Sequence, residues 1–245
     1  MPQDMFYHGS WRMSEEAVRD TIDNGLRPGN PVDAPRTAYM APIAGRTYLT
    51  RDLREAVIYA LGGIVMGTER KESGYGYLFV VLSRDIFDPW PDEDEVGEAA
   101  AAGVFFDPKK RRYVFDTSKA AKAMVAHGID DMIAWNVACA ASRYLVGHPE
   151  RIRRLDMGFP HIAQIGKAIV KEMNPEFRRK VAWTLRNLSH EGRIPIYEVW
   201  RVLRSDAIRI APDASNFFDV ARLWWRRGVS GSVESEKRET SAILA

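Results

Sequence analysis

Two short segments bring together side chains that suit the binding of a polar ligand. The first, residues 6–10 (FYHGS), is an apolar, strand-like stretch that ends on His8, Gly9 and Ser10. Because Gly9 has no Cβ, a ligand can approach its backbone closely, while His8 and Ser10 offer a ring nitrogen and a hydroxyl. The second, residues 47–50 (TYLT), reads as another short strand, with Tyr48 and Thr50 on the same face.

A carboxylate that could act with these groups comes late in the chain. Glu198 lies within IPIYEVWRV, and Glu191 lies just before that stretch. A carboxylate among Ile, Tyr, Val and Trp needs a partner or a function, because burying it alone is costly. The acidic segment 88–98 (DPWPDEDEVGE) is a further source of carboxylates. We interpret it as a solvated acidic loop, with cation binding as the alternative. Its four central acids are Asp92, Glu93, Asp94 and Glu95.

Helices and strands that would position the first two segments can be predicted from local patterns. Residues 14–24 predict a helix with Ser14 as its N-cap and Gly25 at its C-terminal end. Residues 51–61 predict a second helix, because apolar residues recur there at roughly helical spacing. The Pro- and Gly-rich residues 27–46 predict a loop, and the apolar run 77–82 (YLFVVL) predicts a central strand.

The second half of the sequence has a different character. Residues 117–147 and 157–188 are helical in pattern, and Pro175 begins a further helix over 176–188. Residues 192–202 return to strand character, and Ile208 and Ile210 suggest another short strand. The Trp224-Trp225-Arg226-Arg227 run could stack on bases, but we interpret it as an amphipathic end helix. Residues 229–245 have little apolar content and are expected to form a disordered tail.

Composition and charge narrow the class of protein. The 245 residues are 46% hydrophobic, which is enough for a sizeable core, and the single cysteine excludes an internal disulfide. Residues 1–107 hold 10 Lys/Arg and 18 Asp/Glu, a net −8, so the remaining 25 and 15 give +10. The basic part could face nucleic acid or an acidic protein, or complement the acidic part of its own fold.

Several other classes of function are disfavoured. We expect no bound metal, because the histidines lack metal-ligand spacing, and no P-loop or Rossmann motif is present. No apolar run is long enough to span a bilayer and no leader pattern opens the chain, so we expect no membrane association. The expected location is the cytoplasm, or that of a target cell after delivery. The histidines that lack metal-ligand spacing are His127, His148, His161 and His190.

The order of these motifs resembles a known superfamily. His-Gly-Ser on a first strand, then Tyr-Leu-Thr leading into a helix with Ala-x-x-Tyr-Ala, is similar to ADP-ribosyltransferases of the His-Tyr-Glu type. This group includes diphtheria-toxin-like and poly-ADP-ribose-polymerase-like enzymes. The resemblance covers residues 5–90 well and 190–210 loosely. It implies an α+β fold with a split β-sheet core, here carrying a large helical insertion over about 117–188 in a single domain of residues 1–228.

The resemblance also implies roles for individual residues. His8 would bond a ribose hydroxyl of NAD, the Gly9 backbone would bind the nicotinamide amide, and Tyr48 would stack on the nicotinamide ring. Tyr59 would form the opposite side of that pocket. The glutamate of the family would be Glu198, whose surroundings fit better, or Glu191. The full set of expected NAD contacts is His8, Gly9, Ser10, Tyr48, Leu49, Thr50 and Tyr59.

The function implied is mono-ADP-ribosyl transfer from NAD to a macromolecule, with nucleic acid slightly favoured over protein as acceptor. Such an enzyme would be a bacterial or phage toxin or effector, restrained by an antitoxin or inhibitor. Two alternatives remain open at this point. One is an RNA 2′-phosphotransferase-like enzyme on a related fold, and the other is a binding module that has kept the fold and lost the chemistry.

Overall fold

The computed structural model describes residues 5–11, 13–29, 43–61, 75–126, 129–156, 159–203 and 221–228. These residues form two compact units. The sheet unit comprises residues 1–27, 49–87 and 192–245, and the helical unit comprises residues 28–48 and 88–191. The chain therefore passes between the units within strand β2 (Arg46–Thr50), whose last two residues belong to the sheet unit.

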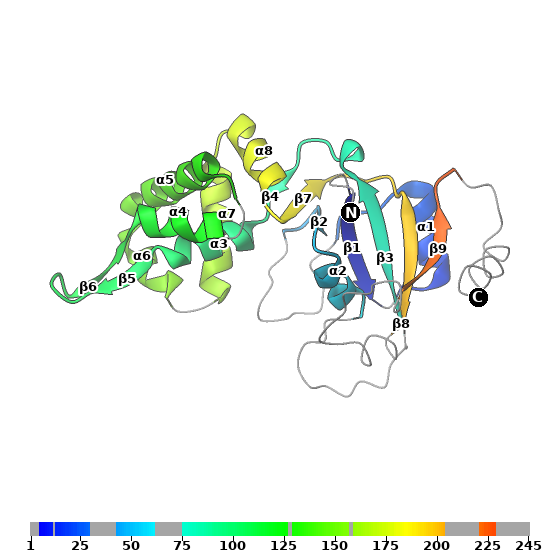
Figure 1. The fold of residues 1–245 in the computed structure, drawn as a ribbon, viewed down its shortest axis with the longest axis horizontal. Helices are drawn as coiled ribbons and strands as arrows, with labels where there is room; N and C mark the ends of the chain where they lie inside the picture. Colours follow the sequence, from blue (N-terminus) through cyan, green and yellow to red (C-terminus); the bar gives the residue numbers. More distant parts are fainter. Residues whose placement is uncertain are drawn as a thin grey trace. The chain divides into compact units, whose positions relative to one another are not determined.

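The sheet unit is built on antiparallel strands in the order β2-β1-β3-β8-β9 (Figure 1). Tyr7 of β1 pairs with Thr50 of β2, and His8 pairs with Phe79 of β3, which pairs in turn with Val199 of β8. The predicted strand at 77–82 is confirmed as the centre of this sheet. The other strands of the unit are β1 (Met5–Trp11), β3 (Tyr75–Leu82), β8 (Glu198–Leu203) and β9 (Ala221–Arg226).

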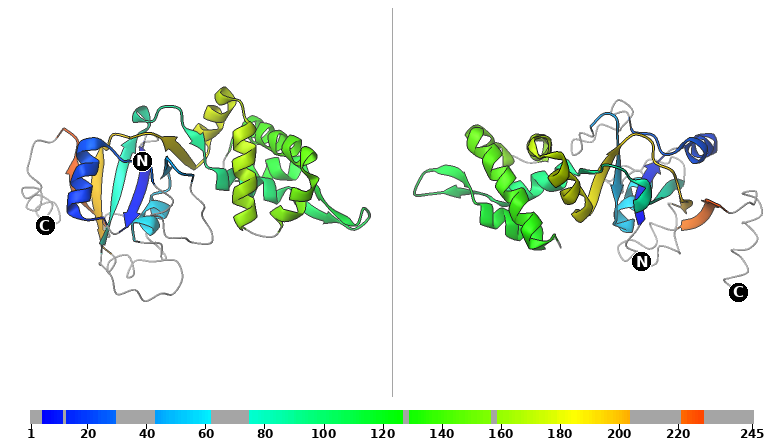
Figure 2. Two further views of the ribbon diagram at one scale, coloured as in Figure 1. Left: turned by 180° about the vertical axis from the view of Figure 1, so that it is seen from behind. Right: turned by 90° about the horizontal axis from the view of Figure 1, so that it is seen from above.

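Two helices cover the opposite faces of this sheet (Figures 1 and 2). Helix α1 (Glu15–Asn24) begins at Ser14, whose side chain accepts a hydrogen bond from the Ala17 N–H, as expected of an N-cap. Helix α2 (Leu53–Ala60) begins at Asp52, which caps two N–H groups. Both predicted helices are thus confirmed. The apolar face of α2 packs on Tyr7, Leu78, Val80 and Val202.

Within the described residues, the helical unit has six helices and several short strands. Its core joins α3, α5 and α7, with Val137, Ile165 and Ile169 almost completely buried. Helices α3 and α7 cross closely because Gly97 and Gly166 face each other: a Cβ on Gly166 would lie 2.9 Å from the Gly97 nitrogen. The helices are α3 (Glu93–Ala102), α4 (Thr117–Ala126), α5 (Asp131–Gly147), α6 (Pro149–Leu155), α7 (Phe159–Glu172) and α8 (Pro175–Thr184).

Short strands complete the helical unit. Strand β4 (Trp90–Pro91) pairs with β7 (Asn187–Glu191), which lies beside β2. A separate hairpin joins β5 (Val104–Asp107) to β6 (Arg112–Phe115). The hairpin extends beyond the helices of its unit in each view (Figures 1 and 2).

The predicted acidic loop at 88–98 is wrong. Asp92 accepts hydrogen bonds from the Asp94 and Glu95 N–H groups and so begins helix α3, which Ala-rich residues continue to Ala102. Asp92 and Glu93 are 8% and 2% exposed, and are therefore not solvated. Asp92-x-x-Glu95 ahead of an apolar run is a helix-start signal, which the high local charge concealed.

Two other predicted elements also differ. The helix expected over 176–188 ends at Thr184, because the chain then extends to pair with β4 as strand β7. The Trp224-Trp225 run forms strand β9, rather than an end helix. Successive side chains of the strand point to opposite faces, so Trp224 is buried. Its ring packs edge-on against that of Tyr77, with ring centroids 5.7 Å apart.

The observed class is mixed α and β with an antiparallel sheet, which confirms the coarse part of the fold prediction. Helices predicted within 117–147 and 157–188 are also found. The single-domain interpretation stays a prediction. The expected strand at Ile208 and Ile210, the tail 229–245, His127 and most of the loop 27–46 lie outside the described residues.

Candidate functional site

His8, Gly9 and Ser10 lie on β1 within the sheet unit. Side chains of directly paired residues in an antiparallel sheet point to the same face. His8 therefore shares a face with Phe79 and Val199, and its ring centroid lies 6.4 Å from that of Phe79. Ser10 shares this face through its pairing with Tyr77. This face is covered by α1, because Arg201, paired with Tyr77, forms an ion pair with Glu15.

Gly9 faces the other side of the sheet, against α2. A Cβ at this position would lie 2.0 Å from the Ala56 carbonyl oxygen and 2.5 Å from the Ala60 nitrogen, so only glycine permits this packing. The same Cβ would lie 2.9 Å from the Cβ of Tyr59. Tyr59 therefore lies over Gly9 while its side chain stays 37% exposed. The structure thus brings together two of the residues expected to contact nicotinamide.

Thr50 and Leu49 have structural contacts at the end of β2. The Thr50 hydroxyl accepts a hydrogen bond from the Asp52 N–H and bonds the Glu55 carboxylate at 3.3 Å. These bonds join the strand to the first turn of α2. Leu49 is 2% exposed and belongs to the core. Both residues hold the local backbone in position.

Glu198 is nearly buried, and both of its oxygens are bonded. Oε1 accepts a hydrogen bond from Arg226 at 2.8 Å, and Oε2 accepts one from the Trp200 indole at 2.9 Å. Its pairing with Val80, which pairs with Tyr7, puts Glu198 on the α2 face of the sheet. Burial, with a smaller contribution from the Glu198 charge, raises the pKa of Tyr7. Glu198 and His8 thus lie on opposite faces of the sheet, and their side chains do not meet.

Tyr48 lies in the helical unit, where its hydroxyl is fully engaged. The hydroxyl donates to Oε1 of Glu93 at 2.5 Å and accepts from the Ile43 N–H at 2.9 Å. Burial and then the Glu93 charge raise the pKa of Tyr48, so its hydroxyl stays protonated. Glu93 is held in turn by the α3–α7 crossing, because a Cβ on Gly166 would lie 1.8 Å from the Glu93 carbonyl oxygen.

Arg46 connects Tyr48's strand to Glu191. Arg46 and Tyr48 are two residues apart on β2 and so project to the same face. The Arg46 guanidinium donates twice to Oε1 of Glu191, at 3.0 and 3.2 Å, and lies 3.8 Å from the centroid of the Trp90 ring. The Glu191 side chain is 58% exposed, so it remains accessible to a ligand. We call Arg46, Tyr48, Trp90, Glu93 and Glu191 the Tyr48 cluster.

Further polar groups surround this cluster. Arg178 of α8 lies 3.3 Å from the centroid of the Trp90 ring, and burial lowers the pKa of its guanidinium. Ser189 and His190 of β7 are buried, and neither the Ser189 hydroxyl nor the His190 Nδ1 has a hydrogen-bond partner among the described residues. Sequence reasoning missed the roles of Arg46 and Trp90, because neither belongs to a recognisable motif.

The acids at the start of α3 have pKa values raised by their surroundings. Burial, and then neighbouring carboxylates, raise the pKa of Asp92 well above its ordinary value. Burial and the Glu93 charge raise the pKa of Asp94 to about 6, against the opposing effect of Lys167.

These shifts predict a pH-dependent effect of Asp94→Asn. Because the folded-state pKa of Asp94 is raised from 3.8 to about 6, the fold favours the protonated carboxyl. The protonated Asp94 carboxyl contributes fully to the free energy of unfolding below pH 4, and this contribution is lost as the pH rises through 6. We expect Asp94→Asn to raise the free energy of unfolding at pH 7 by about 1 kcal/mol, discounted for partial exposure, with no difference near pH 4.

Urea unfolding at pH 4, 6 and 7.5 measures this effect. Glu172→Gln is the matched control, since Glu172 is an exposed carboxylate on α7 of the same unit and is not among the groups that shift the pKa of Asp94. A gain for Asp94→Asn that is equal at all three pH values would contradict the prediction.

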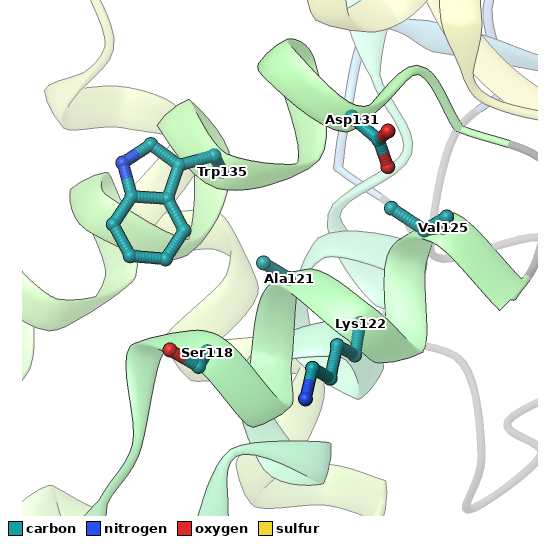
Figure 3. Close-up of a pocket in the computed structure, with 6 residues that line it drawn as sticks. All are labelled: Ser118, Ala121, Lys122, Val125, Asp131 and Trp135. Atoms are coloured by element: carbon teal, nitrogen blue, oxygen red, sulfur yellow. The ribbon is translucent and has the colours of Figure 1, made fainter.

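A groove between α4 and α5 is a separate feature of the helical unit. Figure 3 shows the Trp135 indole on α5, facing the α4 side chains of Ser118 and Ala121. The groove has a volume of about 340 Å³ and is bordered by Lys122 and Asp131. No interaction connects it with the Tyr48 cluster in the described contacts.

Comparison of the chain with models of protein families, with curated proteins and with solved structures finds no match in any of the three. No helix in the described ranges is both long and apolar enough to cross a membrane. Within those ranges, no group of three or more His, Cys, Asp or Glu side chains is arranged to hold a metal ion.

Proposed function

We propose that the protein is a mono-ADP-ribosyltransferase that uses NAD and modifies a macromolecule. One observation carries the proposal: the Tyr7–Thr50 register makes the strand of His8-Gly9-Ser10 the direct antiparallel neighbour of the strand that ends in Tyr-Leu-Thr. Two segments far apart in sequence, each with side chains suited to a nucleotide, thus share one sheet. The resemblance to ADP-ribosyltransferases supplies the expected chemistry.

In the sheet unit, Gly9 and Tyr59 support a role in binding nicotinamide. The missing side chain of Gly9 admits the α2 backbone and so brings Tyr59 beside β1. The carboxamide of nicotinamide needs both a donor and an acceptor. Tyr59, whose Cβ lies beside Gly9 and which is 37% exposed, offers an aromatic ring to nicotinamide. His8 and Ser10 lie on the opposite face of β1 from Gly9, and their proposed ribose contacts rest on the resemblance alone.

In the helical unit, the contacts of Tyr48 favour a binding rather than an acid–base role. Its hydroxyl is held by Glu93 and the Ile43 N–H, so the ring has a defined orientation. A protonated hydroxyl with a raised pKa is a poor base. Stacking on the nicotinamide ring needs only this orientation, and Glu93 is then a positioning residue.

The reaction needs a carboxylate, and Glu191 is the better candidate. As the bond between the ribose C1 and the nicotinamide nitrogen breaks, its electron pair leaves with nicotinamide and the ribose becomes cationic. An ionised carboxylate stabilises that charge until an acceptor oxygen or nitrogen bonds C1 and loses its proton. Glu191 is accessible and held through one oxygen by Arg46, whereas both oxygens of Glu198 are bonded within the fold.

The experiment incubates purified protein with NAD labelled in its adenylate phosphate, and with cellular RNA, DNA or protein. Nicotinamide release is measured by chromatography, and label transfer by mass spectrometry of each acceptor class. His8→Ala and Tyr48→Ala are expected to lose both signals. His148→Ala is the matched control, because the His148 ring bonds the Tyr144 carbonyl of α5 and has no proposed role.

The outcomes separate the competing functions. Label on one acceptor class, lost in both variants and kept in the control, supports the transferase. Absence of label and of nicotinamide release from protein with native circular dichroism would refute it and favour a non-catalytic binding module. Release that persists in His8→Ala and Tyr48→Ala would refute the assigned site.

A further inference from the structure

A second cleft lies in the helical unit, beneath the β5–β6 hairpin. It has a volume of about 810 Å³ and is formed by the hairpin together with α5 and α6. This volume falls within the range of about 300–1,000 Å³ that is typical of sites for small organic groups. The hairpin that forms one wall projects past the helices of its unit (Figure 1).

The charge that lines this cleft has one sign. Lys110, Arg111, Arg112 and Arg153 are exposed cations among its lining residues, and no carboxylate is among them. Two acids lie close to the lining, and both have partners there: exposed Asp156 bonds the Tyr113 hydroxyl, and Asp107 bonds the hairpin turn. Asp107 accepts from the Lys109 and Lys110 N–H groups and forms an ion pair with Lys110. A concave surface of this kind favours a polyanion.

An exposed aromatic ring lies among these cations. Phe106 is 52% exposed, although it lines the cleft, and its ring packs edge-on against Tyr113 with centroids 5.5 Å apart. The opposite wall presents Val146, which is 79% exposed. A solvent-exposed ring held by a neighbouring ring offers a stacking surface for an unpaired base. An acidic polypeptide would use the cations but has no comparable need for the ring.

The hairpin tip holds its cations in a defined backbone conformation. Arg111 has a φ of 51°, a left-handed value that side chains other than glycine rarely adopt. The turn is maintained by the Asp107 side chain, which bonds two successive N–H groups. Arg111 therefore occupies a position where glycine would be less strained. Contact between its positive charge and an anionic ligand would explain an arginine there.

We propose that this cleft binds single-stranded nucleic acid, with phosphates on its four cations and a base stacked on Phe106. Single strands are favoured over duplex because stacking on a side chain requires an unpaired base. RNA and DNA share this chemistry. Binding in this cleft is independent of NAD. That the strand bound in this cleft is also the acceptor of ADP-ribose rests on the proposed transferase function.

The first test measures binding of the full chain to fluorescent 12-nucleotide RNA and DNA strands by anisotropy, without NAD. The double charge reversal Arg112→Glu/Arg153→Glu is expected to weaken binding at least about tenfold. Each phosphate contact on a single strand contributes about −0.7 to the slope of log affinity against log salt. The slope should therefore change from about −2.8 for four contacts to about −1.4 for two.

The matched control is Lys122→Glu/Lys171→Glu, which makes the same charge change at exposed positions of the helical unit outside this cleft. It is expected to change affinity less than threefold. An equal loss in both double variants would show that net charge alone governs binding, and would overturn the proposal.

Two further variants test the aromatic contact and the turn. Phe106→Ala is expected to weaken binding of the single strand about tenfold, with little effect on polyglutamate or on a duplex of the same sequence. Arg111→Gly relieves the left-handed strain, so the protein should be as stable as the parent or more so, while affinity falls. Polyglutamate binding as tightly as the single strand, together with no effect of Phe106→Ala, would overturn the proposal in favour of an acidic protein partner.

This result can be distinguished from failure of the transferase function. Binding lost in the cleft variants, in protein that releases no nicotinamide, supports the cleft and refutes the transferase. Nicotinamide release with no measurable binding to either RNA or DNA refutes the cleft and leaves the transferase intact. Comparison of the two oligonucleotides identifies which nucleic acid is preferred.

Discussion

Glu191→Gln is expected to lower the rate of nicotinamide release from NAD about 100-fold or more. Glutamine keeps the size of the side chain and can still bond Arg46, but it has no charge to stabilise the cationic ribose. Loss of one electrostatic contact to a transition state costs about 100- to 1,000-fold in rate. Because the Glu191 side chain is 58% exposed, the substitution should leave stability nearly unchanged. Single-turnover measurement at saturating NAD separates this loss in rate from a change in affinity.

Glu198→Gln is the matched control for this prediction, and we expect it to lower stability while leaving the rate of nicotinamide release nearly unchanged. Its carboxylate is bonded to Arg226 and Trp200, so the substitution should lower the free energy of unfolding by about 1–3 kcal/mol. The rate of nicotinamide release should change less than about threefold, because transition-state stabilisation is not lost. If Glu198→Gln abolishes release in folded protein while Glu191→Gln does not, the assignment of the carboxylate is wrong.

Gly76→Ala is expected to lower the free energy of unfolding by about 3 kcal/mol or more. A Cβ on this residue would lie 1.6 Å from the Ala60 carbonyl oxygen and 2.5 Å from its carbonyl carbon. Both atoms belong to the backbone, so no side-chain rotation can relieve the clash, and α2 must move away from β3. Overpacking of this kind costs several kcal/mol, since the core around it is already filled. Urea unfolding followed by tryptophan fluorescence measures the loss.

The same substitution at Gly147 provides the control. A Cβ there would have no heavy atom within 4 Å, and Gly147 ends helix α5. Gly147→Ala is therefore expected to be neutral or to stabilise by up to about 1 kcal/mol. Hydrogen exchange should show faster opening of the β3 amides in Gly76→Ala only. Equal stability of the two variants would mean that α2 does not pack on β3 as described.

Local patterns were sufficient to predict the elements whose signals are short-range. Ser14 and Gly25 bracket α1 because a capping hydroxyl and a glycine at φ 80° satisfy groups within one helical turn. The run that forms β3 was predicted because a short, uninterrupted apolar stretch of this length favours a strand buried on both faces. The predicted helix of residues 51–61 was confirmed for the same reason, with Asp52 as its cap.

Elements that depend on distant partners were not predicted. Asp92 and Glu93 looked solvated because their charges dominate the local pattern, yet the α3–α7 crossing buries them. Trp224 is compatible with either a helix or a strand, and its contact with Tyr77 exists only once β9 pairs with β8. Periodicity cannot predict such contacts, since they join residues of different elements: Glu93 and Gly166 are 73 positions apart, and Tyr77 and Trp224 are 147 apart.

The two candidate glutamates show which features of the site the sequence predicts and which depend on the tertiary structure. The sequence by itself determined that a glutamate lies near residues 190–200, and that His8, Gly9 and Tyr48 lie on strands ahead of a helix. Only the tertiary structure decided that Arg226 and Trp200 occupy both oxygens of Glu198, while Arg46 leaves Glu191 accessible. The physical reason is that the availability of a carboxylate depends on which cations and donors surround it, and strand pairing over long separations determines those neighbours.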